Sequence, residues 1–225
     1  MMRLFELTKN YLTFVIKIII VVKLMVVQQK SNQERMLALT FIPLAIAINV
    51  ALGAIVKALN MPLYVDSIGT ILTTILLGWK RGAIVGVLGF VITSIFINPF
   101  AVYFSLTQVA IALFIGFVGK KGWFKSMPSA IGTGFVLGIV VALVSAPVIV
   151  FVFHGATGNG AALVTSFFVQ MGNQIINSIF FTGFSIEPVD KVIQCFLAFF
   201  ILKSIPKNLL KNFSSGSLKE NNFID

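Results

Sequence analysis

Residues 129–153 read SAIGTGFVLGIVVALVSAPVIVFVF, a stretch of 25 residues without one charged side chain. A helix that crosses the hydrocarbon core of a bilayer needs about 20 apolar residues, so this stretch alone predicts a membrane-spanning helix. Outward from it, turn or charge signals separate five more apolar runs, which lie at about 38–59, 67–79, 82–98, 104–119 and 189–204. The sequence therefore predicts an all-α membrane protein, a bundle of six transmembrane helices.

The composition of the whole chain agrees with this prediction. Of 225 residues, 58% are hydrophobic and 11% are charged, and the mean hydropathy is +1.01. Because a soluble domain is about one quarter charged, a soluble enzyme is excluded. The net charge of +10 does not indicate nucleic-acid binding, since no soluble domain is left to carry a basic groove. With only Cys195 and His154, no disulfide, metal site or cofactor is expected.

The basic residues predict the orientation of the helices, because cytoplasmic loops collect Lys and Arg. With the N-terminus inside, 15 of the 17 basic residues are cytoplasmic, and only Lys57 and Lys191 fall on the outer side. Both termini are therefore expected in the cytoplasm. The run at 67–79 is short for a crossing, which suggests a cavity near its N-terminal end.

Residues 161–184 are apolar enough for a seventh crossing, but that crossing would carry four C-terminal lysines to the outer side. We therefore expect an outer-side interfacial or re-entrant helical segment between the fifth and sixth helices. Residues 1–34 form a separate basic segment, in which an interfacial helix is favoured over a further crossing or a start at Met36. The six-helix domain then spans 35–211, and 212–225 is a polar cytoplasmic tail.

Four amide side chains, Gln170, Asn173, Gln174 and Asn177, have the spacing i, i+3, i+4 and i+7. On one helix, this spacing places them on one face. Amides donate and accept hydrogen bonds without net charge, which suits a neutral heterocyclic ligand. A water-facing stripe is the alternative interpretation, although such a stripe usually carries Lys or Glu.

Further candidate binding residues fall on the same expected side of the membrane: Asp66, Asn98, Tyr103, Gln108 and His154. Three of them have a simpler alternative: a helix cap for Asp66, an aromatic belt for Tyr103 and an ordinary loop position for His154. Glu187 and Asp190 are expected at the outer end of the last helix, where Asp190 and Lys191 anchor it. With no carboxylate placed within the membrane, an ion-coupled carrier is disfavoured.

Several of these segments together resemble the S components of energy-coupling factor (ECF) transporters. The resemblance rests on MPLYVDSIGT (61–70), LG (77–78), GAIVG (82–86), SAP (145–147), HGATGNG (154–160) and DKVI (190–193). It covers about residues 35–211 and implies a six-helix subunit, in a bacterial plasma membrane, that captures a vitamin or similar micronutrient from outside.

The resemblance also implies partners for this chain: a transmembrane T component and two ATP-hydrolysing A components. Small residues on the first helix of such proteins contact the T component, and Ala47 and Ala51 fit that pattern here. The chain contains no Walker A sequence, so no enzymatic activity of its own is expected. A membrane ligand sensor and an autonomous secondary carrier remain as alternative functions.

Overall fold

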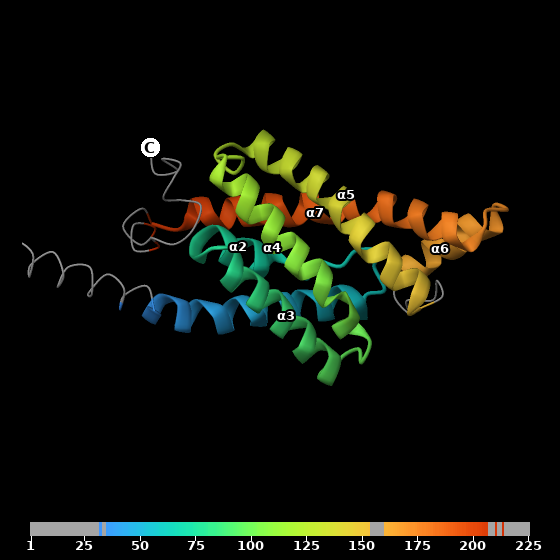
Figure 1. Cartoon of the computed structure of the whole chain (residues 1–225), viewed down its shortest axis with the longest axis horizontal. Coiled ribbons are helices and arrows are strands. Elements are labelled where there is room, and N and C mark those ends of the chain that lie inside the picture. The colour runs from blue at the N-terminus through green and yellow to red at the C-terminus, as the bar shows by residue number, and fades with distance from the viewer. Residues whose placement is uncertain (1–31, 33–34, 154–159, 207–209, 211–212, 214–225) are drawn as a thin grey trace, which may run out of the picture.

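The computed structural model describes residues 32, 35–153, 160–206, 210 and 213, and nothing outside these positions is discussed as structure. The described chain contains helices and no strand (Figure 1). The elements in chain order are the Arg35–Ala58 helix, α2 (Ile68–Leu77), α3 (Trp79–Phe96), the 3-10 turn η1 (Ala101–Phe104), α4 (Ser105–Lys120), α5 (Met127–Phe151), α6 (Gly160–Gln170) and α7 (Ile175–Ser204).

Four segments of the described chain are long and apolar enough to cross a membrane: Arg35–Ala58, Trp79–Phe96, Ala101–Lys120 and Met127–Phe151. Large apolar side chains on these helices point outward, as Phe96, Phe117 and Phe151 do. A soluble surface rarely exposes apolar side chains on this scale. These helices support the prediction of a membrane protein. Two of the six expected crossings, α2 and α7, are not among the four segments.

Helix α2 lies at the centre of the helix bundle, and all ten of its residues are buried. It packs against α3, α4 and α7. Its 10 residues span about 15 Å at 1.5 Å per residue, about half of a hydrocarbon core. Gly78, at φ +92°, separates α2 from α3, in a backbone conformation that favours glycine.

Helix α5 and helix α7 pack with their backbones in close contact. A Cβ atom added at Gly134 would lie 2.6 Å from the Cα atom of Val192, and one at Gly138 would overlap the backbone of Pro188. The small residues of the 129–153 run therefore allow the helices of the bundle to pack closely. Gly82 and Gly86 do the same for α3, facing Thr74 and Gln108.

The segment 161–184 differs from a single inserted helix. It contains most of α6, a turn in which Gly172 has φ +90°, and the first part of α7. The last helix therefore begins at Ile175 instead of about 189, and it continues through Pro188. The sequence interpretation began the last helix at about 189 because the apolar run begins there, after Glu187. Helix α6 folds back against α7, forming the α6–α7 hairpin at one end of the bundle (Figure 1).

The Arg35–Ala58 helix begins, and α7 ends, at the opposite end of the bundle from this hairpin (Figure 1). The ring centroids of Phe41 and Phe213 lie 6.1 Å apart, which brings the two ends of the described chain together. The α2–α3 and α4–α5 junctions, with their basic residues, lie towards the same end (Figure 1). Most basic residues of the described chain therefore cluster at one end of the bundle, as expected. Both ends of the described chain lie at that same end.

Candidate functional site

An open cavity of about 120 Å³ is lined by the second half of the first helix and the later parts of α3 and α5. These parts of the helices lie towards the α6–α7 hairpin (Figure 1). One water needs on the order of 10–15 Å³ by this measure, so the cavity has room for several waters or a small organic molecule. Its walls come from segments far apart in sequence: the second half of the first helix, the 59–67 loop, α3, η1, α4, α5 and α7. It borders the N-terminal end of α2, as the short second run suggested.

The floor of the cavity is a network of buried, uncharged polar side chains. The Asn49 amide nitrogen donates to the Thr70 hydroxyl at 3.0 Å, and that hydroxyl donates to the Gln108 carbonyl at 2.8 Å. The Gln108 amide nitrogen in turn donates to the Ser67 hydroxyl at 2.8 Å. Asn49 and Ser67 line the cavity, while Gln108 supports them from beneath and is 1% exposed. Such satisfied networks hold their members in defined orientations.

The loop that precedes α2 is held in place by side chains of α7. One carboxylate oxygen of Asp190 accepts hydrogen bonds from the backbone nitrogens of Tyr64 (3.0 Å) and Val65 (2.9 Å). The Gln194 carbonyl accepts a further bond from the backbone nitrogen of Ser67 at 2.8 Å. Val65 has φ +46°, which is strained for a β-branched residue. The contacts from α7 therefore fix a loop conformation that the local sequence does not favour.

A buried cluster of charges, the Lys191 cluster, consists of Lys191, Asp66, Glu187 and Asp190. The Lys191 ammonium lies 2.6 Å from an Asp190 oxygen, 3.5 Å from a Glu187 oxygen and 4.0 Å from an Asp66 oxygen. Lys191 is 2% exposed, Asp190 0% and Glu187 5%. The expectation that Asp190 and Lys191 anchor a helix end at the interface is wrong: both lie buried near the middle of α7.

Three members of the Lys191 cluster, namely Lys191, Asp66 and Glu187, also line the cavity. Burial raises the pKa of the Asp66 carboxyl above its ordinary value, and the neighbouring Lys191 opposes that shift. Lys57 also lines the cavity, and its ammonium donates to the Ile97 carbonyl at 3.0 Å. The cavity wall is therefore charged, in contrast to the neutral site that the amide pattern suggested.

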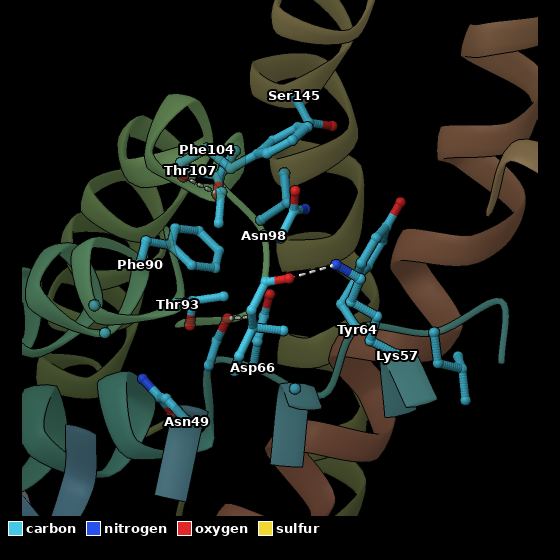
Figure 2. Close-up of a pocket in the computed structure, with 18 of the residues that line it drawn as sticks. Asn49, Lys57, Tyr64, Asp66, Phe90, Thr93, Asn98, Phe104, Thr107 and Ser145 are labelled. Atoms are coloured by element: carbon cyan, nitrogen blue, oxygen red, sulfur yellow. Dashed lines mark hydrogen bonds between the residues drawn. The ribbon is translucent and has the colours of Figure 1, made fainter. Parts of the chain in front are cut away.

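Aromatic rings form the remaining walls of the cavity. Figure 2 shows Phe90 and Phe104 on one side of the space and Tyr64 on the other, with Asn98 among the side chains between them. The Phe104 ring is itself stacked on Phe153 at 5.3 Å between centroids. These rings offer flat apolar surfaces on which a planar ligand can stack.

The structure brings together some of the residues predicted from sequence. Asp66 and Asn98 line the cavity, and Gln108 supports its floor. The simple capping role considered for Asp66 is not seen, because Ser67 is the N-cap of α2 and makes no side-chain capping bond. Tyr103 is 51% exposed and packs edge-on against Phe153, outside the cavity lining. His154 lies outside the described residues.

The four predicted amides do not share a helix face, so that geometric prediction is wrong. Gln170 ends α6, Asn173 and Gln174 lie in the turn, and Asn177 is in the first turn of α7. Three of them are exposed, and none lines the cavity. The helix breaks at Gly172, whose positive φ ends the periodicity on which the prediction depended.

Sequence reasoning missed the Lys191 cluster, although a signal was present. Glu187 and Lys191 stand at i and i+4, and so do Asp190 and Gln194, in an otherwise apolar stretch. Ionisable residues in such a stretch mark a functional site by default. Lys57 and Asn49, from the first helix, carry no comparable local signal, because only the fold brings them to the cavity.

Ala47 and Ala51, the predicted partner-binding residues, are both exposed on the first helix, as is Pro43 one turn earlier. They form an outward stripe of small residues that makes no part of the cavity. In the described part of the chain, no group of three His, Cys, Asp or Glu side chains is arranged to hold a metal ion.

Comparisons with protein-family models, with curated proteins and with solved structures give no match to this chain. The evidence for its function is therefore the chain's own geometry. That geometry joins a ligand-sized cavity, aromatic walls and a buried charge cluster at one end of an apolar helical bundle.

Proposed function

We propose that this protein is the substrate-capture subunit of an ATP-driven importer of the ECF type. It binds a vitamin or related small micronutrient from outside and delivers it inward together with a T component and two A components. One observation carries the proposal: the ligand-sized cavity lies in the half of the bundle away from the basic helix ends. Under the positive-inside rule, those basic ends face the cytoplasm, and the cavity then opens outward.

Six crossings are the topology we propose for the bundle. The four long apolar segments are joined by α7, which is 30 residues long, and by the short, fully buried α2. Helix α7 can carry charges in the membrane because its Lys191 cluster is buried against neighbouring segments, away from lipid. The α6–α7 hairpin then lies on the outer side, where its exposed apolar side chains, such as Leu163 and Phe167, contact the membrane interface.

The exposed stripe on the first helix is our proposed docking face for the T component. Small residues allow the backbones of two membrane helices to approach closely. Replacing Ala47 and Ala51 with Phe should prevent co-purification with T and A components while leaving ligand binding unchanged. Gly132→Phe, at an exposed position on α5 and so away from the stripe, is the control and should assemble normally.

The capture function is tested by purifying the protein and identifying retained small molecules by mass spectrometry. Uptake of the identified compound into vesicles should then require ATP and all the partner components. ATP hydrolysis is assigned to the A components. A purified protein that retains no small molecule, and vesicles that show no partner-dependent uptake of vitamins, would contradict the proposal.

The same experiment locates the binding site. Asn98→Ala should weaken binding of the retained compound by about tenfold, since an amide facing a bound ligand is worth roughly 1–3 kcal/mol when its partner is left unpaired. Asn173→Ala and Asn177→Ala, at the tip of the α6–α7 hairpin, should not change it. If the two hairpin variants weaken binding and Asn98→Ala does not, the binding site lies at the amides of the hairpin.

An autonomous secondary carrier is the second candidate function, because carboxylates do lie within the bundle. Asp190 and Glu187 are buried near the middle of α7, which removes the sequence argument against ion coupling. Uptake of the retained compound into vesicles that contain this chain alone, driven by an ion gradient, would favour the carrier. A membrane ligand sensor would bind the compound with no uptake under either condition.

A further inference from the structure

In and directly behind the cavity wall, three carboxylates (Asp66, Glu187 and Asp190) stand against two ammonium groups (Lys57 and Lys191), and this excess of negative charge indicates a class of ligand. We infer that the cavity binds an organic cation, an ammonium, amidinium or protonated nitrogen heterocycle, joined to a flat unsaturated ring. The inference rests on the proposed capture function and deepens it. It replaces the neutral ligand that the amide pattern suggested with a ligand that carries positive charge.

The Lys191 ammonium makes its closest contact away from the cavity. Its shortest contact, 2.6 Å, is to Asp190, a fully buried residue that does not line the cavity. The other oxygen of Asp190 is occupied by two backbone N–H groups of the 59–67 loop. The Lys191 side chain thus lines the cavity, while its closest ion pair, with Asp190, lies behind the cavity wall.

Two carboxylates remain on the cavity side, those of Glu187 and Asp66. They lie 3.5 and 4.0 Å from the Lys191 ammonium, too far for short charge-assisted hydrogen bonds. The Glu187 Oε2 atom is buried and accepts no hydrogen bond. The Lys191 cluster as a whole sets three carboxylates against one ammonium. A cationic N–H group in the cavity would supply both the missing hydrogen bond and the missing charge.

Lys57, the other cation of the lining, does not supply that charge. Its ammonium donates to the Ile97 carbonyl and makes no ion pair with Asp66 or Glu187 within the described structure. An inorganic cation also fits poorly, because the described residues hold no group of three acidic or histidine ligands. An anionic ligand held by Lys57 is the competing possibility, and the experiment below separates it.

The ring of the ligand is inferred from the aromatic side chains of the same cavity. Phe90, Phe104 and Tyr64 surround the space next to the carboxylates (Figure 2). Aromatic faces stack on planar rings and also attract cations. A planar cationic molecule can pair with the carboxylates and stack on the aromatic rings at the same time.

Three probes with one phenyl ring and different charge test this inference: benzamidine, benzamide and benzoate. Binding to the purified full-length protein in detergent is measured by saturation-transfer NMR. We expect benzamidine to bind about ten- to a hundredfold more tightly than benzamide, the range for a hydrogen bond to a charged group. Benzoate should bind no better than benzamide.

Two variants of similar shape, Glu187→Gln and Asp66→Asn, should each reduce the preference for benzamidine over benzamide by about tenfold. Circular dichroism and size-exclusion chromatography establish that each variant is folded. Lys57→Met removes the other cation of the cavity lining, so it should tighten benzamidine binding and weaken any binding of benzoate.

The possible outcomes separate the inference from the proposed function. Equal binding of the three probes, or a benzoate preference that Lys57→Met abolishes, overturns the cationic class while leaving a binding cavity in place. The same holds if the compound retained by the purified protein is an anion. Absence of any probe binding together with absence of a retained compound overturns the inference and the capture function together.

Discussion

The cavity and the tip of the α6–α7 hairpin are both rich in polar side chains, yet they are built in different ways. At the tip, Gln170 to Asn177 are neighbours in sequence and stay largely exposed, with one local bond from Asn173 to the Phe168 carbonyl. The floor of the cavity and the loop beside it are instead held by side chains that bond to segments distant in sequence: Asn49 to Thr70, Gln108 to Ser67, and Asp190 to the 59–67 loop. Local spacing of polar residues therefore identifies a surface, and long-range polar contacts identify a site.

Asp190→Ala should have the largest effect on the free energy of unfolding. The change leaves the Lys191 ammonium buried without its closest partner and two backbone N–H groups of the loop unbonded. Loss of one partner from a buried pair costs about 3–5 kcal/mol. We expect the free energy of unfolding in detergent to fall by that amount, and ligand binding to be lost with the order of the loop.

Asn177→Ala, at the exposed tip, is the matched control and should change the free energy of unfolding by less than about 0.5 kcal/mol. Similar losses in the two variants would show that the Lys191 cluster does not hold the 59–67 loop.

Gly138→Ala tests the packing that brings α5 and α7 to the cavity. The new Cβ atom would overlap the backbone of Pro188, so the helices must separate. Overpacking of this kind costs about 1–3 kcal/mol. The separation should also move Glu187, which lines the cavity, and weaken ligand binding.

Gly132→Ala on the same helix is the control for Gly138→Ala, because its Cβ atom would meet no neighbour within 4 Å. Helix propensity then predicts a gain of up to about 1 kcal/mol. Gly138→Ala should lower the thermal unfolding temperature, and Gly132→Ala should raise it. Equal shifts in the two variants would argue against close contact of α5 with α7.

The helices and their order were predictable, because apolar length and charged breaks are local properties. Runs at 82–98, 104–119 and 129–153 correspond closely to α3, η1 with α4, and α5. The start of α7 was not predictable in the same way, since Pro188 and three charges resemble a boundary when read locally. Those charges are tolerated within the helix because the 59–67 loop and α5 cover them, which is a property of the fold.

Of the candidate site, Asp66 and Asn98 were identified because polar residues at helix ends are conspicuous. Asn49 was not identified, because it lies inside an apolar helix and acquires its role from Gly69 and Thr70. The amide pattern at 170–177 was misleading for the converse reason: its periodicity assumed a continuous helix, which Gly172 interrupts. Pattern analysis identified the individual polar residues, and the three-dimensional structure decided which of them belong together.

Gln108→Leu should have a smaller effect than Asp190→Ala, because it removes only uncharged hydrogen bonds. The substitution keeps most of the side-chain volume and leaves the hydroxyls of Thr70 and Ser67 each without one partner. Unsatisfied buried groups of this type cost about 1–3 kcal/mol. Gln174→Leu, at the exposed tip, is the control, and its free energy of unfolding should stay close to that of the parent chain.

The smallest expected effect is that of Asn173→Ala. Its amide donates one bond to the Phe168 carbonyl at 3.1 Å, at the partly exposed end of α6, where water can replace it. The free energy of unfolding should fall by about 0.5–1 kcal/mol, as for a helix-terminal hydrogen bond, and ligand affinity should not change. Unfolding and ligand titration of the same preparation measure both quantities. A loss of affinity equal to that of Asn98→Ala would place ligand contacts at the tip, and the distinction between an exposed polar surface and an assembled site would then fail.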